Sequence, residues 1–254
     1  MDSRNRVRAG YHAAMSDVKV NPEAPNPQRP VVQRLRMRYA KRDRLRFTSH
    51  RDFARAFERA VRRAGIPIGF SSGFSPHPKI SYANASPTGA ASEAEYLEIG
   101  LTDERAPDAV REALDEALPP GLDIVEVVIA GTGSLADRLE ASEWRIELPG
   151  VDTDQLAKAV SAFLAATEVT VDRMTKRGLR AIDVRGAVER LSVDGAAVVG
   201  VVRSTIPTVR PDDIVAGLRG HGLDAEGMPV AQRLRQGPLL GSDGDVAVGD
   251  PLRD

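Results

Sequence analysis

The chain alternates basic and apolar residues over Arg34-Leu35-Arg36-Met37-Arg38-Tyr39. Successive side chains of a β-strand point to opposite faces, so this spacing predicts a strand with Leu35, Met37 and Tyr39 on its buried face. The three arginines then lie together on the opposite face. This strand is the first element from which we derive the fold.

Two helices and three further strands are expected after it. Ser49 and Asp52 have the spacing of a capping box, and apolar residues recur at helical spacing from Phe53 until Gly65 ends the helix. A second helix begins near Pro107, and strands are expected at residues 66–70, 96–101 and 124–129. The order β-α-β-β-α-β is the ferredoxin-like pattern, in which two helices cover one face of the sheet and the other face stays open.

The same cycle restarts near Trp144, with a helix after Asp152 and a hairpin signal at Asp194-Gly195. We therefore predict an α+β protein with two tandem ferredoxin-like repeats, of which the second is degenerate. The expected organisation is a disordered arm at 1–30, a first domain at 31–130, a linker at 131–142, a second domain at 143–235 and a flexible tail at 236–254.

Composition excludes several classes of chemistry. The 254 residues contain no cysteine, which excludes disulfides, thiolate zinc sites, iron–sulfur clusters and a cysteine nucleophile within this chain. No ligand spacing typical of a metal site occurs, and we expect neither a metal nor a cofactor here. No apolar run approaches the roughly 20 residues of a membrane span. A cytoplasmic protein without membrane contact is therefore expected.

The net charge of −1 conceals two blocks of opposite sign. Residues 34–63 contain twelve Lys and Arg against three Asp and Glu, and residues 93–126 contain eleven Asp and Glu against two Arg. Such blocks either neutralise one another within a domain or leave a basic face for an anionic partner. Most aromatic residues lie between 39 and 96, among the arginines, and aromatics beside arginines are typical of single-stranded RNA platforms.

The irregular segment 69–93 combines Gly, Ser, Pro, Lys and aromatic residues around His77. Loops of this composition form binding surfaces more often than cores. Pro76 and Pro78 restrict the backbone on both sides of His77, which presents the imidazole at little cost in entropy. Phe74, Tyr82 and Tyr96 are candidates for base stacking; the alternative is that they pack under the loop.

His50 lies in the first turn of the first expected helix. It is interpreted as a contact to phosphate or base, or as a general acid or base; the alternative is an exposed residue hydrogen-bonded to the backbone.

Three segments have a specific likeness to one family: Phe47-Thr48-Ser49-His50-Arg51-Asp52, Gly73-Phe74-Ser75-Pro76-His77-Pro78 and Ser92-Glu93-Ala94-Glu95-Tyr96. They resemble the radical-SAM-linked proteins, which are fused to or encoded beside a cobalamin-type radical SAM protein and have no established activity. The similarity spans roughly residues 33 to 220. It implies a radical SAM partner that would hold the iron–sulfur and cobalamin groups. Arg51 and the segment 86–89 depart from the family pattern.

We expect an accessory protein, without catalytic activity of its own, that binds tRNA or rRNA and presents it to the radical SAM partner. One alternative is a metal-independent endoribonuclease similar to CRISPR RNA-processing enzymes, with His50 as general base; another is a protein-only adaptor. The residues expected to bind RNA or a partner are Arg46, Ser49, His50, Arg51, Arg55, Arg59, Arg62, Ser72, Gly73, Phe74, Pro76, His77, Pro78, Lys79, Ser81, Gly89, Ser92 and Glu93.

Overall fold

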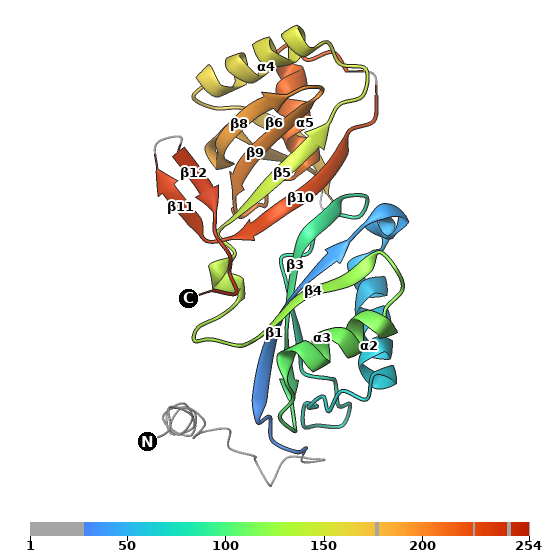
Figure 1. Ribbon diagram of the computed structural model, residues 1–254. Helices are drawn as coiled ribbons and strands as arrows, with labels where there is room; N and C mark the ends of the chain where they lie inside the picture. Colours follow the sequence, from blue (N-terminus) through green and yellow to red (C-terminus); the bar gives the residue numbers. More distant parts are fainter. Residues whose placement is uncertain (1–27, 176–177, 226, 243–244, 254) are drawn as a thin grey trace, which may run out of the picture.

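The computed structural model describes residues 28–175, 178–225, 227–242 and 245–253 (Figure 1). The arm expected at 1–30 lies outside the described residues up to position 27. The predicted α+β class is confirmed, because helices and a large mixed sheet make up the fold. No helix in the described ranges is long and apolar enough to cross a membrane.

The first half forms a four-stranded sheet in the order β4-β1-β3-β2, with antiparallel neighbours. Its elements are β1 (Gln33–Lys41), the 3-10 helix η1 (Asp43–Phe47), α2 (His50–Arg63), β2 (Ile80–Ala83), β3 (Ala91–Leu101), α3 (Pro107–Ala117) and β4 (Leu122–Ile129). The expected strand at 66–70 is wrong, since only isolated bridges from Ile68 and Phe70 occur there. Pro67 and Pro78 lack the N–H group that a continuous ladder needs.

The second half forms a sheet in the order β10-β5-β9-β8, again with antiparallel neighbours. Its elements are η2 (Ala136–Arg138), β5 (Ala141–Glu147), α4 (Thr153–Ala165), β6 (Thr170–Thr175), β7 (Gly178–Asp183), η3 (Arg185–Ala187), β8 (Val188–Asp194), β9 (Ala197–Arg203), α5 (Pro211–Gly220) and β10 (Val230–Gly237). Strands β6 and β7 form a separate hairpin that the sequence patterns did not predict.

The two halves share one continuous sheet because β10 pairs in parallel with the start of β3. The pairing is short: Gln232 lies opposite Ala91, and Arg233 lies opposite Ser92. Figure 1 shows the two halves meeting where β10 reaches β3, with α2 and α3 packed on one half and α4 and α5 on the other. We call this meeting point the junction.

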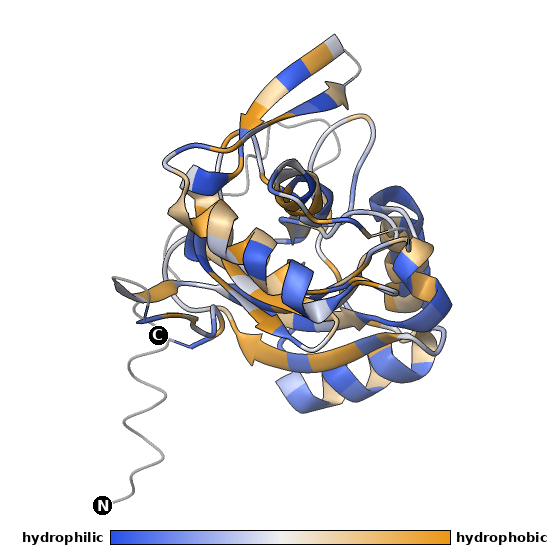
Figure 2. Cartoon of the chain, turned by 90° about the horizontal axis from the view of Figure 1, so that it is seen from above, coloured by the Kyte–Doolittle hydropathy of each residue, from blue (hydrophilic) through white to orange (hydrophobic). Residues whose placement is uncertain are grey.

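Each half has its own apolar core between its sheet and its helices. Phe53 and Phe57 of α2 are fully buried against β1 and β3, as their spacing predicts. The second core gathers around Phe163 and Trp144. Figure 2 shows hydrophobic residues concentrated in the strands, and helices that carry both hydrophilic and hydrophobic residues.

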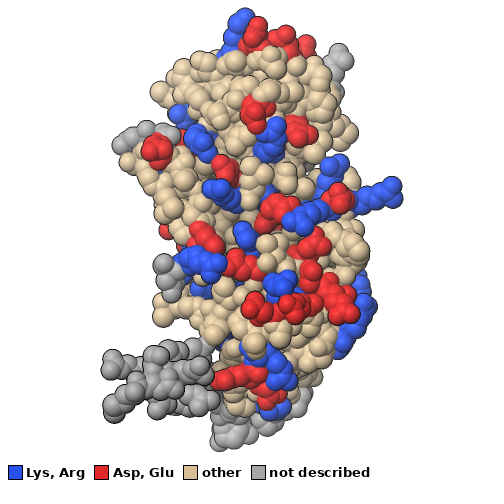
Figure 3. Space-filling view, in the orientation of Figure 1, with Lys and Arg blue, Asp and Glu red and all other residues tan. Residues whose placement is uncertain are grey.

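The sheet face of the first half that bears no helix is largely occupied, and the expected open face is wrong. Arg34 and Arg36 pair with Glu98, and Arg38 pairs with Glu126. Leu135 and Leu139 of the connection to β5 pack on Ala94 and Tyr96, and the carbonyl of Gly133 accepts a hydrogen bond from Arg36 at 2.5 Å. Apolar residues of the connection thus cover the part of this face around Ala94 and Tyr96. Figure 3 shows the two signs of charge interleaved on the visible surface.

The segment expected as a flexible tail from 236 contains two strands in the structure. Strands β11 (Leu239–Ser242) and β12 (Asp245–Val248) pair as a hairpin. Val246 and Val248 pack on Ala141 and Val201, so alternating apolar residues give this short segment a buried face.

Candidate functional site

Most of the residues predicted to bind RNA or a partner fall into two groups at opposite ends of β3. Arg46, Ser49, His50, Gly89, Ser92 and Glu93 lie where β3 begins. The loop at 72–79 lies where β3 ends. The N–H of Gly69 donates to the carbonyl of Gly100, and the N–H of Gly100 donates to the carbonyl of Lys79. Ser92 and Gly100 are separated by eight strand positions, which is about 25 Å. The ring of His50 contacts Tyr82 of β2, while the backbone of Arg46 before α2 contacts Gly89.

An exposed row of arginines on α2 extends between these two ends. Arg51, Arg55, Arg59 and Arg62 are all exposed, and their spacing places them on one side of the helix, opposite Phe53 and the other buried residues. We call these four residues the α2 arginine stripe. Arg55 lies 4.0 Å from Asp52, and within the described residues no carboxylate pairs with the other three.

A buried polar cluster fills the junction beside the start of α2. We call it the junction cluster, and its members are Tyr39, Lys41, Ser86, Glu95 and Arg233. The guanidinium of Arg233 lies 3.1 Å from Glu95 and 2.8 Å from the carbonyl oxygen of Asn84, and it stacks 4.8 Å from the Trp144 ring centre. The second oxygen of Glu95 accepts the backbone N–H of Ser86 at 2.9 Å. Glu95 therefore connects the loop before β3 to β10.

A bulge in β3 turns several polar side chains toward this cluster. Tyr39 lies opposite Glu95, and Lys41 lies opposite Ser92. An advance of two residues along β1 therefore corresponds to three residues along β3. The extra residue shifts the alternation of side chains, and Ser92 and Glu95 point to the same side of the sheet. Burial raises the pKa of the Tyr39 hydroxyl and lowers the pKa of the Lys41 ammonium group.

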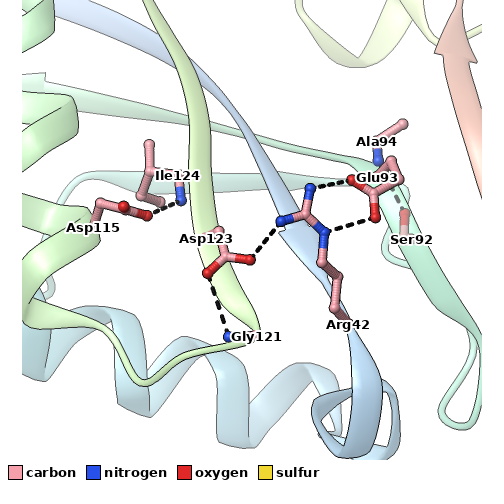
Figure 4. Close-up of polar contacts among 8 residues, drawn as sticks. All are labelled: Arg42, Ser92, Glu93, Ala94, Asp115, Gly121, Asp123 and Ile124. Carbon is pink, nitrogen blue, oxygen red and sulfur yellow. Dashed lines mark hydrogen bonds and ion pairs between the residues drawn. The ribbon is translucent and has the colours of Figure 1, made fainter.

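Glu93 belongs to a structural ion-pair network next to the junction. Arg42 binds Glu93 through two hydrogen bonds of 2.8 and 2.5 Å and binds Asp123 at 2.8 Å (Figure 4). Hydrogen bonds to Glu93 raise the pKa of Arg42. Arg42 thus ties β3 to β4, which explains Glu93 without a ligand.

The start of α2 is formed as the sequence predicts. Ser49 is the N-cap, and its hydroxyl oxygen accepts the N–H of Asp52 at 3.2 Å. The ring of His50 is exposed and meets the ring of Tyr82 edge to face, with centroids 5.0 Å apart. Arg46 stacks on the exposed Phe47 and its carbonyl oxygen accepts the N–H of Gly89, which closes the segment 86–89 over η1.

The three candidate stacking residues have different environments. Tyr96 is 3% exposed and packs under the connection to β5, so it is no stacking residue. Tyr82 is half-buried between His50 and Phe53. Phe74 is 94% exposed at the tip of its loop. Of these three residues, only Phe74 has an exposed ring that is free to stack on a base.

The loop from Ser72 to Ser81 is held by its own backbone. Ser71 and His77 exchange two hydrogen bonds, in which the N–H of Ser71 donates to the His77 carbonyl and the N–H of His77 donates to the Ser71 hydroxyl. Gly73 has a φ of 135°, a conformation that other residues rarely adopt. These contacts leave Phe74 and His77 exposed on a defined turn, with Ser81 in β2.

None of the five members of the junction cluster is among the residues that the sequence predicted to bind RNA or a partner. Lys41 and Glu95 continue the buried rows of β1 and β3, and this alternation could have identified them. Arg233 has no comparable signal, because it lies among polar residues in β10. In the described ranges, no three His, Asp or Glu side chains come together as they would to hold a metal ion.

A family model described as an uncharacterized protein conserved in bacteria (DUF2344) matches residues 34–211. The chain belongs to this family. No curated protein matches it. The matched range begins in β1 and ends at the start of α5, so it includes the α2 arginine stripe and most of the junction cluster, with Arg233 beyond it.

Proposed function

We propose that this protein binds single-stranded or structured RNA through the α2 arginine stripe and presents it to a radical SAM partner. The observation that supports RNA binding is the stripe itself: four exposed arginines on one side of a helix, three of them without a carboxylate partner among the described residues. Unpaired surface arginines are suited to phosphate contacts, because their guanidinium groups bind phosphate oxygens in pairs.

The dimensions of the stripe fit several nucleotides. Eleven helical steps separate Arg51 from Arg62, which corresponds to about 16 Å along the axis. The Arg55–Asp52 contact is exposed and 4.0 Å long, and such pairs contribute little, so Arg55 is available as well. Phe47, which shortly precedes α2, and Phe74, in the loop at 72–79, are exposed and offer aromatic rings for base stacking.

The radical SAM partner is proposed on the sequence resemblance. The segments that support it, around Ser49-His50 and Pro76-His77-Pro78, lie at the two ends of the stripe. The sequence has no cysteine, so the iron–sulfur chemistry of such a pair would belong to the partner.

We expect the purified protein to bind single-stranded RNA with a strong dependence on salt. Four phosphate contacts predict a slope of about −3 for the logarithm of the binding constant against the logarithm of the salt concentration. Fluorescence anisotropy with a labelled oligonucleotide measures this slope. The salt concentration should run from about 50 to about 200 mM, because phosphate contacts weaken over this range. Absence of binding at the lowest salt would contradict RNA binding and favour the adaptor alternative.

A second expectation concerns His50 and separates an RNA binder from a nuclease. Within the described residues, the His50 side chain has a ring contact with Tyr82 and no carboxylate that would orient it as a general base. We expect RNA to remain intact in metal-free buffer and His50→Ala to weaken binding only modestly. Cyclic-phosphate ends, together with a loss of roughly 100-fold or more in cleavage by His50→Ala, would instead establish a nuclease.

A further inference from the structure

The junction cluster contains more buried positive charge than its carboxylate neutralises. Lys41 and Arg233 are each 5% exposed, and Glu95 is the one carboxylate that contacts either of them in the described structure. Among the described residues, the Lys41 ammonium group has a single polar contact, 3.5 Å from the carbonyl oxygen of Pro87. Buried charges in proteins are normally paired, because an unpaired one is costly to remove from water.

Two polar atoms of the same cluster have no hydrogen-bond partner among the described residues. These atoms are the hydroxyl of Ser86 and the Nε of Arg233. Each belongs to a residue that is more than nine-tenths buried. Native proteins leave few such atoms, and each calls for an explanation. Both residues also contact Glu95 through other atoms, the Ser86 N–H at 2.9 Å and the Arg233 Nη1 at 3.1 Å, so they belong to one connected cluster.

We propose that the junction cluster binds a phosphate group between Lys41, Ser86 and Arg233. The three side chains provide an ammonium, a hydroxyl and a guanidinium donor, the groups that bind phosphate oxygens in proteins. The added negative charge would balance the second buried cation. Burial lowers the pKa of Lys41, and a bound anion would oppose that shift by favouring the charged amine.

Such a site would couple ligand binding to the connection between the two halves. Lys41 belongs to β1, Ser86 to the loop before β3 and Arg233 to β10, so a single phosphate would contact three separate segments. This proposal does not depend on the α2 arginine stripe, whose side chains are exposed while these are buried.

Thermal unfolding of the full chain tests the site. With inorganic phosphate at 100 times its dissociation constant, the wild-type Tm should rise by about 5–10 °C above that in sodium chloride of equal ionic strength. Lys41→Met should have a higher Tm without phosphate, because it removes a buried unpaired charge, and should bind phosphate at least about tenfold more weakly, which reduces the Tm rise at the same phosphate concentration to about half or less. Lys158→Met, which removes an exposed lysine on α4, should respond like the wild type.

Ser86→Ala gives an independent measurement, since it removes one hydroxyl and no charge. Calorimetric titration should show that this variant binds phosphate about fivefold more weakly.

Adenosine 5′-monophosphate, with adenosine as its control, distinguishes a nucleotide phosphate from the free ion, and tighter binding of either form agrees with the site. A phosphate response that is absent in the wild type, or unchanged in both Lys41→Met and Ser86→Ala, would overturn the proposal. Charge reversal of the α2 arginine stripe should leave the response intact, which separates this site from RNA binding.

Discussion

Replacing Arg233 with methionine should lower the free energy of unfolding by about 3–5 kcal/mol. The substitution leaves the carboxylate of Glu95, which is 1% exposed, without its ion-pair partner. It also removes the hydrogen bond to the Asn84 carbonyl, one of the contacts that join β10 to the first half. Methionine can retain part of the packing on Trp144, so the loss reports mainly on the buried charge.

Urea denaturation of the full chain measures this loss, provided that the slope with denaturant stays constant. Arg235→Met is the matched control: Arg235 is two positions along β10, is exposed and lies 3.8 Å from Glu143. Its replacement should change the free energy by no more than about 0.5 kcal/mol. Combining Arg233→Met with Glu95→Gln should recover a large part of the loss, since the amide oxygen can still accept the Ser86 N–H. A loss below about 1 kcal/mol for Arg233→Met would show that water or flexibility relieves the buried carboxylate.

The local patterns of the first half predict its two helices and the strands β1, β3 and β4, but not β2, because apolar periodicity and caps are local properties. Alternation from Arg34 to Tyr39 predicts β1, and Ser49 with the Phe53–Phe57 spacing predicts α2 and its buried side. The pairing of Arg34 with Glu98 also follows from alternation on neighbouring strands.

The features that the sequence did not predict depend on contacts between distant segments. The connection through Leu135 covers the helix-free face, and nothing in its composition distinguishes it from an exposed linker. Arg233 is buried because β10 pairs with β3, more than 130 residues away along the chain.

Reversing three charges of the α2 arginine stripe should weaken RNA binding by at least about 100-fold at 0.1 M salt and reduce the magnitude of the salt slope by about 2. The variant is Arg55→Glu with Arg59→Glu and Arg62→Glu. Each substitution removes a phosphate contact and adds a charge that repels the backbone of the RNA. The three side chains are exposed, opposite the buried Phe57, so the fold should persist.

The new acids near the end of α2 oppose the helix dipole, which costs about 0.3–1 kcal/mol for the residues of the last turn. Circular dichroism and thermal unfolding therefore accompany the binding measurement. A control with Lys158→Glu, Arg180→Glu and Arg219→Glu changes the net charge equally at exposed positions of the second half. If that control loses as much affinity, net charge and not the stripe determines binding. If the stripe variant binds RNA as tightly as the wild type does, the RNA binds elsewhere on the protein. The loss of three phosphate contacts would necessarily change the salt dependence of binding.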